Sequence, residues 1–237
     1  RDYEEEFSIP QTADEDFFPI FGWLTPGNPA PQFRGAGADN APPTYTDYYH
    51  AEYALANFTT NLELDEYAGF GVKYRPLGNL DDRRLVEIEK DSMVWWLGGA
   101  DEPGEKEFAS LAQRHARLKR LAPSKGFWTN LFPTYADDFP SLDDYDHYIK
   151  AYIDTVKPSL LTYDHYALIG KDPEIHHNVY RDDYFANLEI VRNRVLEAGI
   201  EFGVILQVGG FMVYRSASEA ELRWQVFTTL AYGARSL

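Results

Sequence analysis

Residues 93–103 read Met-Val-Trp-Trp-Leu-Gly-Gly-Ala-Asp-Glu-Pro, and this stretch decides the predicted fold. The apolar run at 93–97 predicts a buried strand, and a segment with helical periodicity begins after Pro103. Asp101 and Glu102 therefore stand where a strand leaves the core and enters a loop. In parallel α/β proteins, catalytic and binding residues gather at this position. The alternative interpretation is a helix N-cap, since Asp caps helices and Pro suits a first helical turn.

The alternation of strands and helices extends over most of the chain. Strands are expected at 17–22, 58–62, 71–74, 93–97, 127–131, 160–164 and 202–207. Apolar residues recur at helical spacing over 108–118, 145–156, 184–195 and 222–230. Because no hairpin signals separate these elements, their order predicts parallel strands joined by crossover helices.

The strand count favours a closed (β/α)8 TIM barrel that lacks most of strand eight and helix eight. Seven strands are expected, and an eighth begins near 235–237. No glycine-rich dinucleotide fingerprint follows the first strand, which disfavours a doubly wound sheet. We expect an N-terminal extension over 1–16 and a single, C-terminally incomplete barrel domain over 17–237.

Composition excludes several classes of partner. The 237 residues carry a formal charge of −16, so nucleic acid, which needs a basic surface, is not expected. No apolar run has transmembrane length, so no membrane insertion is expected. The chain has no cysteine and therefore no disulfides or thiol chemistry. No cofactor is predicted, and the oligomeric state is left open.

In a barrel, the site is built from residues at the carboxyl ends of the strands. The residues expected there are Trp23, Glu63, Asp101, Glu102, Asn130, Tyr163, Asp164, His165, Tyr166 and Gln207. Carboxylates and amides hydrogen-bond to sugar hydroxyls, and aromatic rings stack on sugar faces. This set predicts a carbohydrate ligand. It does not suit phosphoryl transfer, which needs glycine-rich amide loops or a metal clamp.

Five stretches, taken in this order, resemble the (β/α)8-barrel glycoside hydrolases of the clan-A and β-galactosidase-like superfamily, and more narrowly bacterial barrel proteins of that type. They are Phe-Pro-Ile-Phe-Gly-Trp at 18–23, Trp-Leu-Gly-Gly-Ala-Asp-Glu-Pro at 96–103, Trp-Thr-Asn-Leu-Phe-Pro at 128–133, Leu-Thr-Tyr-Asp-His-Tyr at 161–166 and Trp-Gln-Val-Phe-Thr-Thr-Leu-Ala-Tyr-Gly-Ala at 224–234. The resemblance implies that Glu102 is the general acid/base. The residue before that glutamate is usually Asn in clan-A enzymes, but here it is Asp101. The nucleophilic Glu expected at the end of strand seven is replaced by Gln207, so a standard retaining mechanism is not implied.

These features predict a glycoside hydrolase that cleaves a poly- or oligosaccharide by acid/base catalysis with two carboxyl groups. Glu102 is the expected acid and Asp164, at the end of the strand at 160–164, is the expected second carboxylate, with Glu63 in reserve. Strands four and six are not adjacent, which favours the wider separation of an inverting enzyme. A function on polymeric glycans suggests an extracellular, cell-surface or periplasmic protein.

Two other functions remain open as alternatives to the glycoside hydrolase. Because Gln207 cannot act as a nucleophile, the first is a non-catalytic carbohydrate-binding barrel, or a component of a larger surface glycan-handling protein. The second is a metal-dependent hydrolase with Asp164, His165, His176 and His177 as ligands. It is disfavoured because the first strand carries no His-x-His, and no metal site is predicted.

Overall fold

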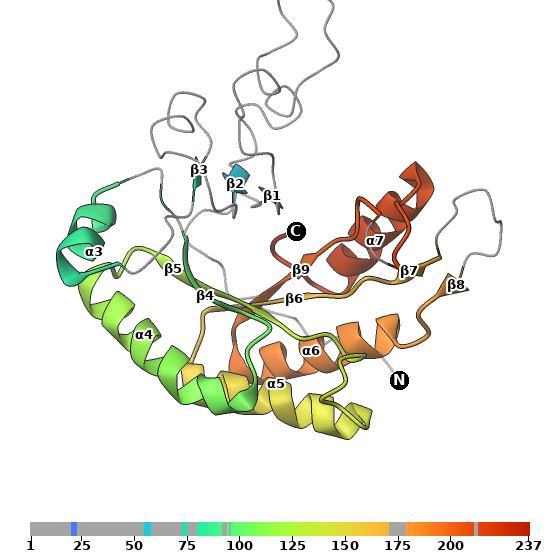
Figure 1. Cartoon of the computed structure of the whole chain (residues 1–237), viewed down its shortest axis with the longest axis horizontal. Coiled ribbons are helices and arrows are strands. Elements are labelled where there is room, and N and C mark those ends of the chain that lie inside the picture. The colour runs from blue at the N-terminus through green and yellow to red at the C-terminus, as the bar shows by residue number, and fades with distance from the viewer. Residues whose placement is uncertain are drawn as a thin grey trace, which may run out of the picture.

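A parallel sheet covered by helices forms the described part of the protein (Figure 1). The computed structural model describes the backbone of residues 20–22, 55–57, 73–74, 80–91, 94, 96–170, 179–210 and 213–237, and the side chains of 80–91, 94, 97–170, 180–210 and 213–237. The sheet contains, in this order, β4 (Trp96–Asp101), β5 (Gly126–Leu131), β6 (Leu160–Asp164) and β9 (Glu201–Ile205). All its strand pairs are parallel, so the predicted α/β class is confirmed.

Crossover helices connect these strands and lie on one face of the sheet (Figure 1). The short turn η1 (Glu105–Glu107) and α4 (Phe108–Leu121) follow β4, α5 (Leu142–Val156) follows β5, and α6 (Tyr184–Ala198) precedes β9. After β9 comes α7 (Glu219–Ala231). The strands run toward the right of Figure 1 and the helices return, so all four strands finish at the same end.

The helix α3 (Asp82–Glu89), which precedes β4, was not predicted. Asp81 caps it by accepting a hydrogen bond from the Arg84 backbone N–H at 2.8 Å. Leu85 and Ile88 are its buried residues, a pair at spacing i, i+3 that is too short to reveal helical periodicity.

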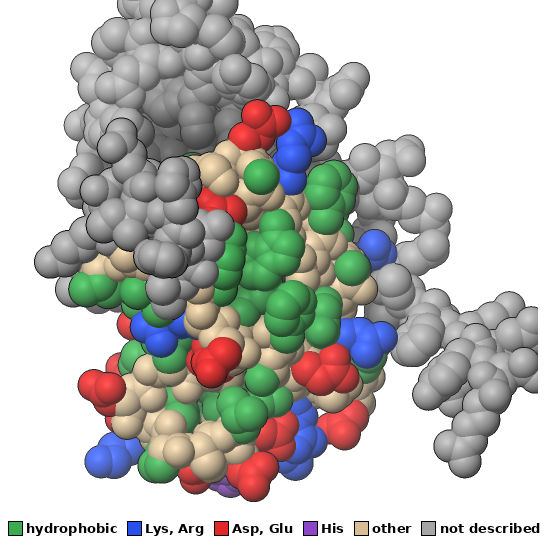
Figure 2. All heavy atoms as spheres, turned by 90° about the vertical axis from the view of Figure 1, so that its right-hand side faces the viewer, with side chains coloured by type: hydrophobic (Ala, Val, Ile, Leu, Met, Phe, Trp, Pro, Cys, Tyr) green, Lys and Arg blue, Asp and Glu red, His purple; other side chains and the backbone are tan. Residues whose placement is uncertain are grey.

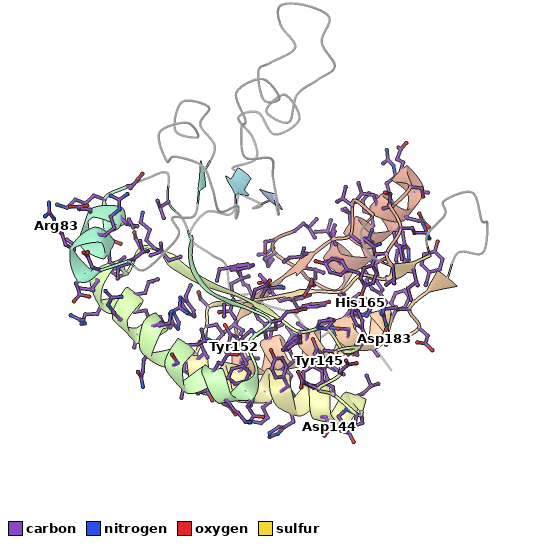
Figure 3. The ribbon with its side chains drawn as sticks, in the orientation of Figure 1. Arg83, Asp144, Tyr145, Tyr152, His165 and Asp183 are labelled. Carbon is purple, nitrogen blue, oxygen red and sulfur yellow. The ribbon has the colours of Figure 1, made fainter. Side chains whose placement is uncertain are left out.

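The main core lies between the sheet and the crossover helices. Phe127 of β5 stacks on His115 of α4 with ring centroids 4.9 Å apart, and His115 Nδ1 bonds to the Val156 carbonyl at 2.9 Å. Tyr145 and Tyr152 of α5 are fully buried against the same face (Figure 3). His115 and the tyrosine stripe are therefore packing residues, as their positions on apolar helix faces predict.

Two predicted helix ends are confirmed. Gly199 ends α6 with φ of 64°, a left-handed conformation that glycine adopts without a steric penalty. At the start of α7, Ser218 and Glu221 form a reciprocal capping box.

Some strand predictions need correction. The strand expected at 93–97 lies later, at 96–101. The strand expected at 58–62 lies outside the described residues, and β2 (Leu55–Asn57) was not predicted. An antiparallel pair, β7 (Leu168–Ile169) with β8 (Val179–Tyr180), contradicts the expectation that hairpins are absent. Strands of two residues are too short to show an alternating pattern, so the sequence carries no signal for them.

Residues 235–236 lie beside β9, where an eighth strand was expected. A parallel bridge joins Gly203 to Ser236, and the Arg235 N–H donates to the Phe202 carbonyl at 2.8 Å. A Cβ at position 203 would lie 2.0 Å from Ser236 Oγ, so this close approach requires glycine. Ser236 forms an isolated bridge, and the strand expected near 235–237 stays a prediction.

A second parallel sheet contains β1 (Ile20–Gly22), β2 and β3 (Lys73–Tyr74) in sequential order. Among the described residues no strand pair joins it to the larger sheet, so the closed barrel stays a prediction. The predicted boundary at residue 16 lies outside the described residues. In the described part of the chain, none of the helices has the length and apolar character needed to cross a membrane.

Candidate functional site

Carboxyl groups from two different strands meet around one amide. Asn130 Nδ2 in β5 donates to Asp101 Oδ1 at 3.0 Å and to Asp164 Oδ1 at 2.9 Å. Each oxygen lies about 3 Å from the same nitrogen, so the two oxygens are at most twice that distance apart. The sequence-based expectation that the Asp101-Glu102 pair and the 163–166 segment share one site is confirmed for Asp101 and Asp164.

The parallel register explains this meeting. Asp101 pairs with Asn130 near the carboxyl ends of β4 and β5, and Asn130 pairs with Thr162, two residues before Asp164 at the end of β6. The register of β4 shifts between Gly98 and Asp101. Gly99 permits this irregularity because a Cβ there would lie 2.9 Å from the Trp128 carbonyl oxygen.

Glu102 has a strained backbone. Its φ is 46°, and among the described residues only Lys157 shares a positive φ without being glycine. Such a conformation costs on the order of 1 kcal/mol in a non-glycine residue. The Glu102 N–H donates to the Asn130 carbonyl at 2.8 Å, which holds the residue beside the cluster.

Helix capping does not account for the acidic pair. Gly104 is the N-cap of η1 and Glu107 is the N-cap of α4. Asp101 instead accepts its bond from the Asn130 amide. The capping interpretation is therefore wrong.

Burial and like charge perturb the cluster. Burial, followed by the charges of Asp164 and Asp101, raises the pKa of Glu102 to about 7. Burial also raises the pKa of Asp164, although hydrogen bonds from Asn130 and Tyr166 oppose that rise. With a pKa of about 7, Glu102 is partly protonated near neutral pH.

This shift makes the folded state sensitive to the charge of Glu102. Folding raises the pKa of Glu102 from 4.5 to about 7. The contribution of Glu102 to the free energy of unfolding is therefore fully present below pH 4.5 and is lost as the pH rises through 7. Glu102→Gln is therefore expected to raise the free energy of unfolding at pH 8 by about 1–2 kcal/mol, and to give no gain below about pH 4.5. Denaturant unfolding at both pH values measures this. The control is Glu105→Gln at an exposed carboxylate, and an equal gain at both pH values would contradict the expectation.

Aromatic rings border the carboxylates. The Tyr166 phenol hydrogen-bonds to Asp164, and its ring centroid lies 5.3 Å from that of Tyr214. Tyr135 OH accepts a bond from the Tyr166 N–H at 3.1 Å, and the Arg181 guanidinium lies 3.6 Å from the Tyr135 ring centroid. Figure 2 looks onto the end of the sheet where the strands finish, and hydrophobic side chains gather there with acidic ones beside them.

Sequence reasoning missed Tyr135, Arg181 and Tyr214. Tyr135 could have been found, because it lies in the loop directly after strand five. Tyr214 comes to the site through an antiparallel bridge to Ile169 of β7, and Arg181 follows β8. Both depend on the unpredicted hairpin.

Two predicted site residues have their contacts elsewhere, although the His165 ring also packs on Tyr135 with centroids 4.9 Å apart. Tyr163 is fully buried in the core beneath the sheet, which contradicts its assignment to substrate binding. His165 Nε2 lies 3.1 Å from Asp183 Oδ1 at the start of α6 (Figure 3). The reason is alternation: neighbours of Asp164 along an extended chain project to the opposite side.

Gln207 has a structural role instead of the predicted substrate contact. It is buried, its Nε2 donates to the carbonyls of Leu168 at 2.9 Å and Arg215 at 2.6 Å, and its Oε1 accepts from the Leu168 N–H at 2.9 Å. Both amide hydrogens are used, so this side chain has no donor left for a ligand.

Several predicted residues cannot be placed. Trp23 and Glu63, and the histidines His176 and His177 of the metal alternative, lie outside the described residues. Within the described ranges, no group of three or more His, Cys, Asp or Glu side chains is arranged to hold a metal ion. The metal-dependent alternative therefore gains no support.

Comparison with protein-family models and with curated proteins finds no match for the chain. The resemblance to glycoside hydrolases therefore stays a prediction, and the geometry of the site carries the functional argument.

Proposed function

We propose that the protein is a glycoside hydrolase in which Glu102 is the general acid and Asp164 is the second carboxylate. The observation that carries the proposal is the meeting of carboxyl groups around Asn130 at the ends of β4 and β6, next to Glu102, whose pKa burial raises to about 7. Glycoside hydrolysis requires such a pair, with one member still protonated near neutral pH.

The surroundings favour this division of roles. Asp164 accepts hydrogen bonds from Asn130 and Tyr166, which stabilise its charged form. Among the described residues, no hydrogen bond lowers the pKa of Glu102, and burial is the main cause of its rise. In the proposed reaction Glu102 gives its proton to the glycosidic oxygen as the C–O bond breaks. Water attacks the anomeric carbon, and Asp164 accepts the proton of that water, as in an inverting enzyme.

Other residues of the site fit a sugar. Asp101 is exposed and can accept hydrogen bonds from hydroxyls, and Tyr166 offers a ring next to the carboxylates. Trp23 and Glu63 stay predicted contacts. The proposal includes closure of the strands into the predicted barrel, because closure would bring further strand ends to this site.

Turnover of a broad panel of oligosaccharides tests the proposal, with release of reducing ends as the readout. Because the proposed acid must be protonated, kcat is expected to fall as the pH rises above about 7. Activity that is constant from pH 6 to pH 9 would contradict the assignment of Glu102.

The non-catalytic carbohydrate-binding protein is the second candidate. Gln207 supports it, because an amide stands at the position after β9 where a carboxylate nucleophile was expected. Its hydrogen bonds to backbone carbonyls give this amide a structural role. Binding of a glycan without turnover, measured by calorimetry over the same panel, would favour this candidate.

A further inference from the structure

Arg181 is a partly buried cation beside the aromatic rings of the site. Its guanidinium Cζ lies 3.6 Å from the centroid of the Tyr135 ring and 6.0 Å from that of Tyr214. Within the part of the chain whose side chains are described, none of the ion pairs involves Arg181. Arg215, by contrast, is buried and pairs with Glu221. Because a guanidinium keeps its charge and is normally paired when it is withdrawn from solvent, Arg181 calls for an anionic partner.

The two Nη atoms of Arg181 are the donors that a ligand can reach. Nε is buried without a hydrogen-bond partner, whereas the Nη atoms, which also make none of the described hydrogen bonds, are not sealed from solvent. At a separation of 3.6 Å the guanidinium lies flat on the Tyr135 ring, and such a contact leaves the N–H donors in its plane unused. What remains is an end-on pair of nitrogens, whose spacing matches the two oxygens of a carboxylate.

Asp183, the carboxylate two residues after Arg181, is engaged elsewhere (Figure 3). Its Oδ1 lies 3.1 Å from His165 Nε2, and its Oδ2 accepts a hydrogen bond from Thr134 Oγ1 at 2.7 Å. Because Thr134 directly precedes Tyr135, the same contacts hold the ring on which the guanidinium lies. The ring and the cation are therefore placed before any ligand arrives, which lowers the entropic cost of binding.

Two tyrosines link Arg181 to the carboxylates of the site. The Tyr135 hydroxyl accepts a hydrogen bond from the Tyr166 N–H at 3.1 Å, and the Tyr166 phenol hydrogen-bonds to Asp164. A ligand that spans this distance meets acceptors at one end and cationic donors at the other. Sugar hydroxyls can donate to Asp164, whereas an acid group is repelled there and is attracted by Arg181. A sugar that carries an acid group matches both ends.

We propose that Arg181, lying on the Tyr135 ring, binds the ionised carboxyl group of a uronic acid, so that the glycan taken at this site is an acidic one. The sugar part rests on the proposed hydrolase function, whereas the preference for a carboxylate rests on Arg181 and its surroundings. The parent hexose carries a hydroxymethyl group in place of the carboxylate. It therefore lacks both the charge and the paired oxygens, and should bind more weakly.

Binding of monosaccharides tests the preference without requiring turnover or a known linkage. Glucuronate, galacturonate and mannuronate are each compared with the parent hexose by ligand-observed NMR. At least one uronate is expected to bind about tenfold or more tightly than its hexose. Equal binding within every pair, or no binding of any uronate up to about 50 mM, would overturn the proposal. Inorganic phosphate that displaces the uronate at equal concentration would also overturn it, because the site would then select charge alone.

Substitutions of Arg181 separate recognition of the acid group from a structural effect. Arg181→Gln should reduce the preference to near unity, whereas Arg120→Gln, which removes an exposed guanidinium at the end of α4, should preserve it. Arg181→Lys keeps the charge but loses the planar pair of nitrogens, so an intermediate preference is expected. This second variant keeps the proposal testable if Arg181→Gln does not fold. A preference that neither Arg181 variant lowers would overturn the proposal.

The outcome also distinguishes this inference from the proposed hydrolase function. Uronate-selective binding that depends on Arg181 but is accompanied by no turnover would support the inference while contradicting the hydrolase. Cleavage of neutral glycans by a protein that shows no preference for uronates would do the reverse.

Discussion

Glu102→Gln is expected to lower kcat by about 10²- to 10⁴-fold on any glycan that the protein cleaves. The amide keeps the size of the side chain but cannot give a proton to the leaving oxygen. Glu102 is also held in place by its backbone bond to Asn130, so the substitution should leave the geometry of the site intact. Steady-state kinetics with an unactivated substrate measures the effect.

The same substitution distinguishes a catalytic loss from unfolding. Because Glu102→Gln is expected to stabilise the folded protein at pH 8, a loss of activity would come with a gain in stability. Substrates with a good leaving group need less acid assistance and should be affected less. Glu105→Gln, a change of the same kind at an exposed position, should retain activity. Near-normal turnover of unactivated glycans by the Glu102 variant would remove the residue from the mechanism.

Gln207→Ala is expected to lower the free energy of unfolding by about 3 kcal/mol. The substitution removes three side-chain hydrogen bonds. The Leu168 N–H and the Arg215 carbonyl lose this partner, whereas the Leu168 carbonyl keeps its bond from the Arg215 N–H at 3.2 Å. Each buried polar group left without a partner costs about 1–3 kcal/mol, and a water entering the space left by the side chain would recover part of that. Urea unfolding followed by circular dichroism measures the loss.

A matched control is Gln113→Ala on the exposed face of α4, which should change stability by less than about 0.5 kcal/mol. If Gln207 bound substrate, as its position at the end of a strand suggested, its removal would mainly raise KM and leave the unfolding transition almost unchanged. That result would overturn the structural role.

The parallel α/β order and several residues of the candidate site could be predicted from the sequence alone. Short apolar runs separated by helical periodicity specify strands joined by crossover helices, since a strand needs a continuous apolar segment and a helix a periodic one. Parallel strands finish at one end of a sheet. Asp101, Asn130 and Asp164, each at or near the end of an apolar run, could therefore be predicted to meet, and two hydrogen bonds from one amide now join them.

Which side chains at those strand ends reach the candidate site depends on how the helices pack on the sheet. The sequence places Tyr163, Asp164 and His165 side by side, but the packing of α5 and α6 against one face of β6 takes Tyr163 into the core and His165 to Asp183. The role of Gln207 depends on contacts with segments that are not its neighbours along the chain. The same holds for the pKa of Glu102, which arises from burial and from a carboxylate that lies 62 residues later in the sequence. Burial, strand register and distant charges are properties of the assembled chain, so no local pattern could encode them.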